Sequence, residues 1–134
     1  MNFKKFLTKY KYENNSNKEI IVYTVIFGHY DKLNKINFLE KNTDYVCFTD
    51  QNINDSTWKI IRVDPEKYNK ILLARIFKFN PHILFNSFEK SIFIDGSIKI
   101  NCNLSELINK YAHQSKIALF KHPTRNCVYK EITA

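Results

Sequence analysis

The stretch Ile20-Ile21-Val22-Tyr23-Thr24-Val25-Ile26-Phe27, closed by Gly28, decides the fold class of this chain. It is an almost unbroken run of β-branched, aromatic and other apolar residues, which is typical of a strand that is buried on both faces. Such strands belong mainly to parallel sheets, in which helices connect the strands and cover them. The run therefore predicts a buried strand of a parallel α/β sheet.

The rest of the chain alternates strand and helix patterns, which favours an α/β sheet with helices on both faces. Further strands are predicted at 44–49, 58–63, 91–94, 98–100 and 117–120. A helix is predicted to begin at Pro65 and to end or kink at Pro81, because proline suits the first turn but removes a backbone donor inside a helix. Its buried face is expected to comprise Tyr68, Ile71, Leu72, Ile76 and Phe79. Asn103 and Glu106 form a capping box for a second helix over 104–113.

Length and composition predict one globular domain, residues 19–134, after a polar basic arm, residues 1–18. The chain has neither a run of about 20 apolar residues nor a secretory signal pattern, so a cytoplasmic location is expected. The net charge of +8 comes mostly from lysine. A nucleic-acid-binding domain would rest on this charge alone, since neither a basic helix nor an aromatic-basic stacking platform is evident. The arm is either a solvated, partly frayed terminus, which is favoured, or a peripheral contact with the inner face of an anionic membrane.

The only two glycines, Gly28 and Gly96, each lie just beyond a predicted buried strand. In open α/β sheets, ligands bind in the crevice beyond the carboxyl ends of the strands. We therefore expect Asp95 at the carboxyl end of a central strand, on the same crevice as Gly28 and Asp50. Asp95 and Ser97 supply oxygens that suit a divalent cation, although Asp-Gly also suits an ordinary turn.

Several other polar residues are candidates for a ligand site, each with an ordinary alternative. The cations Arg75 and Lys78 share a helix face that suits a diphosphate or is simply solvated. Tyr30, Asp31 and Asp50 stand at strand ends, where they bind a nucleoside or cap loops. Near the end of the chain the grouped polar residues are either a sugar contact or a polar tail; they are His122, Arg125 and Glu131.

Six segments taken in order resemble one family. They are Val22-Tyr23-Thr24-Val25-Ile26-Phe27-Gly28-His29-Tyr30-Asp31, Asp44-Tyr45-Val46-Cys47-Phe48-Thr49-Asp50, Ser56-Thr57-Trp58, Ala74-Arg75-Ile76-Phe77-Lys78-Phe79-Asn80-Pro81-His82, Ile92-Phe93-Ile94-Asp95-Gly96-Ser97 and His122-Pro123-Thr124-Arg125-Asn126-Cys127-Val128-Tyr129-Lys130-Glu131. Together they resemble, over residues 20–131, the glycosyltransferase-like family that includes plant mucilage and pollen enzymes and bacterial surface-polysaccharide proteins.

The resemblance implies a GT-A type fold, a Rossmann-like sheet that binds a nucleotide sugar, usually a uridine diphosphate sugar, with manganese or magnesium. In that fold a DxD motif after a central strand holds the ribose, the metal and the diphosphate. Asp95-Gly96-Ser97 occupies its place with Ser97 instead of the second carboxylate, which puts tight metal binding in doubt. The donor-binding residues implied are Phe27, Tyr30, Asp31, Asp50, Arg75, Lys78, Asp95, Gly96 and Ser97.

The implied activity is transfer of a sugar from the nucleotide donor to a glycan or lipid-linked glycan acceptor, as in surface-polysaccharide or capsule synthesis. The alternative is a non-catalytic nucleotide-sugar binder or an assembly subunit of such a system. Glycosyltransferases of this type generally need a second half that binds the acceptor, whereas this sequence ends at Ala134. We therefore expect the donor-binding part alone, with weak transfer unless a partner completes it.

Overall fold

The computed structural model describes residues 2–29, 31–112 and 116–119, and it divides the chain into two units, Met1–Asn101 and Cys102–Ala134. The first unit contains a sheet of four parallel strands in the order β3-β2-β1-β4. The strands are β1 (Ile20–Ile26), β2 (Thr43–Thr49), β3 (Lys59–Arg62) and β4 (Lys90–Phe93). This arrangement confirms the parallel α/β class predicted from the sequence.

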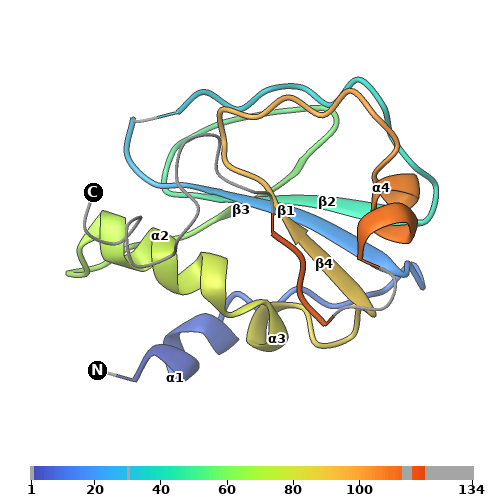
Figure 1. Cartoon of the computed structure of the whole chain (residues 1–134). Coiled ribbons are helices and arrows are strands. Elements are labelled where there is room, and N and C mark those ends of the chain that lie inside the picture. The colour runs from blue at the N-terminus through green and yellow to red at the C-terminus, as the bar shows by residue number, and fades with distance from the viewer. Residues whose placement is uncertain (1, 30, 113–115, 120–134) are drawn as a thin grey trace, which may run out of the picture. The chain divides into compact units, whose positions relative to one another are not determined.

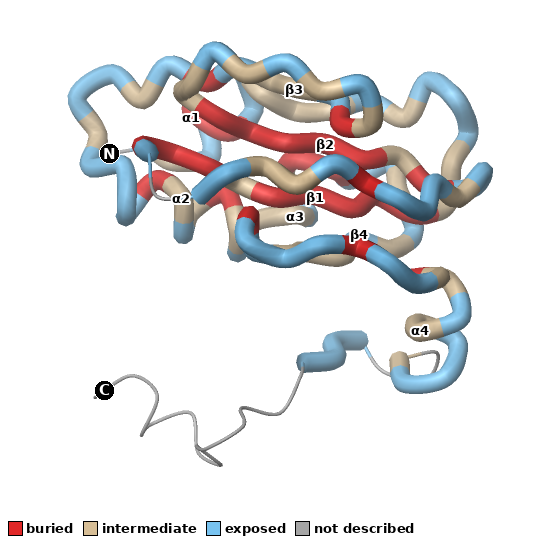
Figure 2. The backbone as a smooth tube through the Cα atoms, turned by 90° about the horizontal axis from the view of Figure 1, so that it is seen from above, coloured by how far each residue is buried: buried red, intermediate tan, exposed pale blue. Residues whose placement is uncertain are grey.

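The two inner strands, β1 and β2, are the most deeply buried part of the sheet. They pair with each other over all seven residues, and β4 pairs with the first four residues of β1. Figure 2 shows that they are buried at all positions except Val25 and Asp44, in contrast with the intermediate and exposed residues of β3 and β4. The apolar run that predicted a strand buried on both faces is therefore confirmed.

Three helices lie on one face of this sheet (Figure 1). They are α1 (Phe3–Thr8), α2 (Lys70–Phe79) and α3 (Pro81–Leu84). The other face is covered by irregular segments, chiefly 31–42 and 50–58 (Figure 1). The described helices of this unit therefore cover one face of the sheet.

The core between the sheet and the helices is rich in aromatic rings. Phe77 of α2 packs against Phe48 of β2 at a centroid distance of 5.0 Å and against Phe27 at 5.4 Å. Tyr23 of β1 packs against Phe85 at 4.8 Å, and its hydroxyl donates to the Lys78 carbonyl at 2.5 Å. Rings supply much buried area with few rotatable bonds, so they fix α2 and α3 against the strands.

The amino-terminal segment belongs to this core. Phe6 and Leu7 of α1 are 4% and 0% exposed, and the ring of Phe6 lies 5.0 Å from that of Tyr68. Asn2 caps the helix by accepting from the Lys5 backbone N–H at 3.1 Å. The expectation of a solvated, frayed terminus is therefore wrong for residues 2–12, because the apolar residues among the lysines form a buried helix face.

The start and the buried face of α2 differ from the prediction. The helix begins at Lys70 rather than at Pro65, because Asn69 caps it by accepting from the Ile71 and Leu72 N–H groups at 3.0 and 3.1 Å. Its buried residues are Leu73 and Phe77, and it exposes Ile71, Leu72 and Phe79. The face that packs on the sheet therefore differs from the predicted one. Pro81 ends α2 as predicted, and it also begins α3, which the sequence analysis did not predict.

Two predicted strands are not formed in the described residues. Residues 98–100 and 117–119 have no strand partner. A short apolar run becomes a strand only when a neighbouring strand completes its backbone hydrogen bonds. The side chains of Ile117 and Leu119 are 75% and 81% exposed. In the second unit α4 (Leu104–Tyr111) is present, and the Asn103 side chain accepts from the Glu106 N–H at 3.0 Å, which confirms the predicted cap.

Candidate functional site at the carboxyl edge of the sheet

The ends of β1, β2 and β4 bring three predicted site segments to one edge of the sheet. Because these strands are parallel, their carboxyl ends share an edge, and the residues that follow them are Gly28, Asp50 and Asp95. The expectation of a central strand before Asp95 is wrong for the described sheet, in which β4 is the last strand of the order. The shared edge itself is as predicted.

Asp50 is held by three donors at the end of β2. Its Oδ1 accepts from the Gly28 backbone N–H at 2.9 Å and from the Gln51 side chain at 2.8 Å, and its Oδ2 lies 2.6 Å from Lys70 Nζ. The carboxylate side chain is only 5% exposed. Burial raises the pKa of Asp50, but the Lys70 ammonium and the two hydrogen bonds outweigh burial and lower it to about 2. Asp50 is therefore an ionised clamp between β1, β2 and the start of α2.

Gly28 needs to be glycine because its φ is 79°, in the left-handed region that other residues avoid. This backbone turn directs the chain away from β1 and presents its N–H to Asp50. Lys70 was not predicted as a site residue. Its only sequence signal is its place just after the cap residue Asn69, which gives no hint of a partner on another strand.

The turn after β4 packs against the segment after β1. A Cβ on Gly96 would lie 2.9 Å from Ile26 Cγ1 and 3.1 Å from Asp31 Cβ, so glycine is required here for close approach. Asn34 Nδ2 donates to the Ser97 carbonyl at 3.2 Å. The structure thus brings Asp31 beside Asp95-Gly96-Ser97, with the side chains of Asp31, Asp95 and Ser97 exposed to solvent.

A second set of contacts, absent from the sequence prediction, holds the segment that carries Asp31. Trp58 Nε1 donates to the Asn34 carbonyl at 2.9 Å, and Thr57 Oγ1 accepts from the Ile36 N–H at 3.0 Å. Asp55 Oδ1 in turn accepts from the Thr57 and Trp58 N–H groups. Burial raises the pKa of Asp55, and these hydrogen bonds outweigh it and lower the pKa below its usual range.

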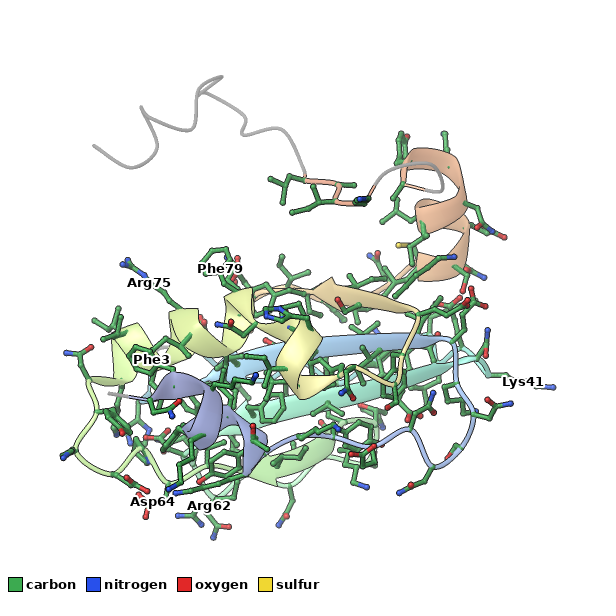
Figure 3. All side chains as sticks on the ribbon, turned by 90° about the horizontal axis from the view of Figure 1, so that it is seen from below. Phe3, Lys41, Arg62, Asp64, Arg75 and Phe79 are labelled. Atoms are coloured by element: carbon green, nitrogen blue, oxygen red, sulfur yellow. The ribbon has the colours of Figure 1, made fainter. Side chains whose placement is uncertain are left out.

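The two predicted cations of α2 lie in different surroundings. Arg75 is exposed and projects outward from the helix, as does Phe79 (Figure 3). Lys78 is partly buried, and its Nζ lies 4.8 Å from the ring centroid of Phe93, two residues before Asp95. Lys78 is therefore held against Phe93 of β4, the strand that leads to Asp95.

The remaining predicted residues divide into core residues and residues that are not described. Phe27 is 4% exposed and belongs to the core, so its ring is not presented at the surface of the edge. Tyr30 and the predicted sugar contacts lie outside the described residues; the latter are His122, Arg125 and Glu131. Within the described residues, no group of three or more histidine, cysteine, aspartate or glutamate side chains is placed to hold a metal ion. None of the described helices is long and apolar enough to cross a membrane.

Comparison with known proteins identifies the family. Neither curated proteins nor solved structures gave a match. The model of the TOD1/MUCI70 glycosyltransferase-like domain matches residues 49–134, a range that includes Asp50, Arg75 and Asp95 and covers more than half of the chain. This chain belongs to the TOD1/MUCI70 glycosyltransferase-like domain family.

Proposed function

We propose that this chain binds a uridine diphosphate sugar at the carboxyl edge of its sheet, as the donor-binding part of a glycosyltransferase that acts on a glycan or lipid-linked glycan. The family supports glycosyl transfer in general. The choice of edge rests on one observation, the contact of the Asp31 segment with Gly96, which sets two exposed carboxylates on adjoining loops. Ligands of open α/β sheets bind at this edge.

The charges at this edge suit the parts of such a donor. Carboxylates accept hydrogen bonds from ribose hydroxyls, which is the role proposed for Asp31. Lys78, held against Phe93, and the exposed Arg75 offer positive charge to a diphosphate. Asp50 has a positioning role in this proposal, because its oxygens already accept from three donors within the protein.

A manganese or magnesium ion is compatible with this edge in one limited way. Magnesium is commonly held by one or two carboxylates together with substrate phosphates, without a full protein cage. Asp95 and Asp31 would supply the carboxylates, and Ser97 a neutral oxygen. The ion would offset the negative charge of the diphosphate. Because the protein contributes so few ligands, we expect the metal to bind with the donor rather than before it.

The test is calorimetric titration of the full chain with three nucleotides, each with and without manganese. They are uridine diphosphate, uridine diphosphate glucose and uridine diphosphate N-acetylglucosamine. Asp95→Asn should weaken donor binding about tenfold or more, as expected for loss of a hydrogen-bonded charge. Glu89→Gln is the matched control, since Glu89 is an exposed acid just before β4, at the opposite edge. Failure of the native chain to bind any of these nucleotides would overturn the proposal.

Turnover decides between the proposed transferase and the alternative of a non-catalytic binder. The measurement is release of uridine diphosphate in the presence of a mixed pool of glycan acceptors. Slow release that depends on acceptor supports the transferase, whereas tight donor binding without any release supports the binder or assembly subunit. Short DNA and RNA serve as comparison ligands, and thermal stabilisation by these but not by uridine diphosphate would favour a nucleic-acid role.

A further inference from the structure

A pocket of about 340 Å³ lies at the amino edge of the sheet, at the other end of β2 from Asp50. It arises because β3 pairs with β2 only from Val46 onward, so the first three residues of β2 have no β3 neighbour. Residues from four separate segments line this pocket, including Tyr12, Leu39, Thr43, Asp44 and Lys59. The volume falls in the usual range for small-molecule sites.

A carboxylate, Asp44, and an ammonium group, Lys59, line this pocket, and both contact the same tyrosine, Tyr12. Asp44 Oδ2 accepts from the Tyr12 hydroxyl at 3.1 Å, and Lys59 Nζ lies 5.1 Å from the centre of the Tyr12 ring. The ring is fixed from behind by Phe88, stacked at 5.9 Å. Asp44 and Lys59 form no ion pair with each other among the described residues. A hydrogen-bond acceptor and a donor are thus held apart in one pocket.

Two further lining residues, Thr43 and Leu39, give the pocket one polar and one apolar wall. Thr43 is 5% exposed, and its buried Oγ1 has no hydrogen-bond partner within the described part of the chain. Buried polar groups are nearly always paired, so this hydroxyl is an exception, and its residue lies in the wall of the pocket. Leu39, by contrast, is 57% exposed and gives the pocket an apolar wall.

We propose that this pocket binds one saccharide unit of a glycan, at a site separate from the donor edge. A sugar hydroxyl both donates and accepts, so one hydroxyl can donate to Asp44 while a hydroxyl of the same ring accepts from Lys59. The C–H face of the ring suits the apolar side chain of Leu39. A nucleotide suits the pocket poorly, because the Asp44 and Glu40 side chains that line it are acidic and repel phosphates.

The choice of a saccharide over another polyol rests on the proposed function. The presence of the pocket itself does not depend on that function. β2 has seven residues, so the two edges are roughly 20 Å apart at the ordinary rise of a strand. A glycan chain several sugars long would span that distance. The pocket would then hold a distant unit of the acceptor chain and increase its effective concentration at the donor edge.

The test uses the full, isotopically labelled chain and four named probes: glucose, galactose, N-acetylglucosamine and maltotetraose, each at millimolar concentration. Binding of at least one probe should shift the backbone NMR signals of 39–45 and 57–59. Lys59→Gln should weaken that binding about tenfold or more, as for loss of one charged hydrogen bond. Lys35→Gln is the matched control, because Lys35 is exposed and does not line the pocket.

A second variant, Asp44→Asn, keeps the shape of the side chain and should also weaken binding. Its melting temperature is measured first, since Asp44 also holds Tyr12. Absence of any probe-induced shift, or shifts confined to residues 28–34 and 94–97, would overturn the pocket proposal. Titration with uridine diphosphate is a separate measurement. Nucleotide binding without saccharide binding would overturn only the pocket proposal. Saccharide binding without nucleotide binding would overturn only the proposed donor site.

Discussion

Asp50 ties three parts of the sheet edge together through a single charge, and this makes stability depend on pH. A carboxyl group whose pKa is lower in the folded than in the unfolded state stabilises the fold above its unfolded pKa, near 4. With a folded pKa of about 2, that contribution is about 2 kcal/mol and disappears as the pH falls from about 4 to about 2. Asp50→Asn should therefore be less stable by about this amount at pH 7.

The measurement is urea unfolding of native and Asp50→Asn protein at neutral pH and at several values between pH 4 and 2. The native chain should lose more stability across that range than the variant. Asp64→Asn is the control, since Asp64 is an exposed aspartate that makes no ion pair within the described residues. Equal slopes for native protein and Asp50→Asn would show that the clamp carries no net stabilisation.

At the scale of elements, helix α1 holds the lysines of the amino-terminal segment on the surface of the folded unit. Phe6 and Leu7 are buried, so the outward side presents Lys4 and Lys5 of the helix and Lys9, the residue that follows it. Among the described residues Lys9 pairs with Glu66 at 3.5 Å, and no ion pair is formed by Lys4 or Lys5. Near an anionic bilayer each lysine contributes about 1 kcal/mol. We therefore expect this helix, as a folded element, to bind vesicles that contain phosphatidylglycerol.

Sedimentation with such vesicles tests this expectation at low ionic strength. Replacing Lys4, Lys5 and Lys9 together by glutamine should lower the partition coefficient on the order of a hundredfold. The control replaces three exposed lysines of another segment, and these are Lys32, Lys35 and Lys41. Equal losses in both triple variants would mean that only the net charge of +8 matters.

The elements also show what the sequence could and could not predict. β1, β2 and β4 follow from their apolar runs, and α4 from its cap, because these signals are local. The start of α2 was missed because Asn69 and Pro65 both resemble helix starts, and the choice is made by the turn in which Tyr68 N–H donates to the Pro65 carbonyl. The strand at 98–100 was overpredicted because its apolar residues say nothing about whether a neighbouring strand exists.

The same limit applies to the site. Gly28, Asp50 and Asp95 could be placed at one edge from the sequence, because parallel strands put their carboxyl ends together. The partner of Asp50 could not be placed, since Lys70 is 20 residues away and belongs to a helix whose start was mispredicted. The contact of Asp31 with Gly96 could not be predicted either, because it depends on how two loops pack against each other.

For the whole molecule, the core cluster is contained in the first unit. All of its buried members lie between Phe6 and Phe85. We therefore expect a chain ending at Asn101 to fold with the same sheet and to melt within a few degrees of the full chain. Circular dichroism melting of both chains checks this. Loss of the cooperative transition in the shorter chain would show that residues after 101 are needed for the fold.

The strand order has a consequence for synthesis of the chain on the ribosome. β1 is made early and lies between β2 and β4, yet its partner β4 is 70 residues further along, as in the pair Tyr23 and Phe93. At roughly 5–20 residues per second, one edge of this apolar strand stays open for several seconds during translation. An open, uncharged β-branched edge is prone to pair with other nascent chains. The order of the sheet therefore predicts a nascent chain that depends on chaperones until β4 has been made.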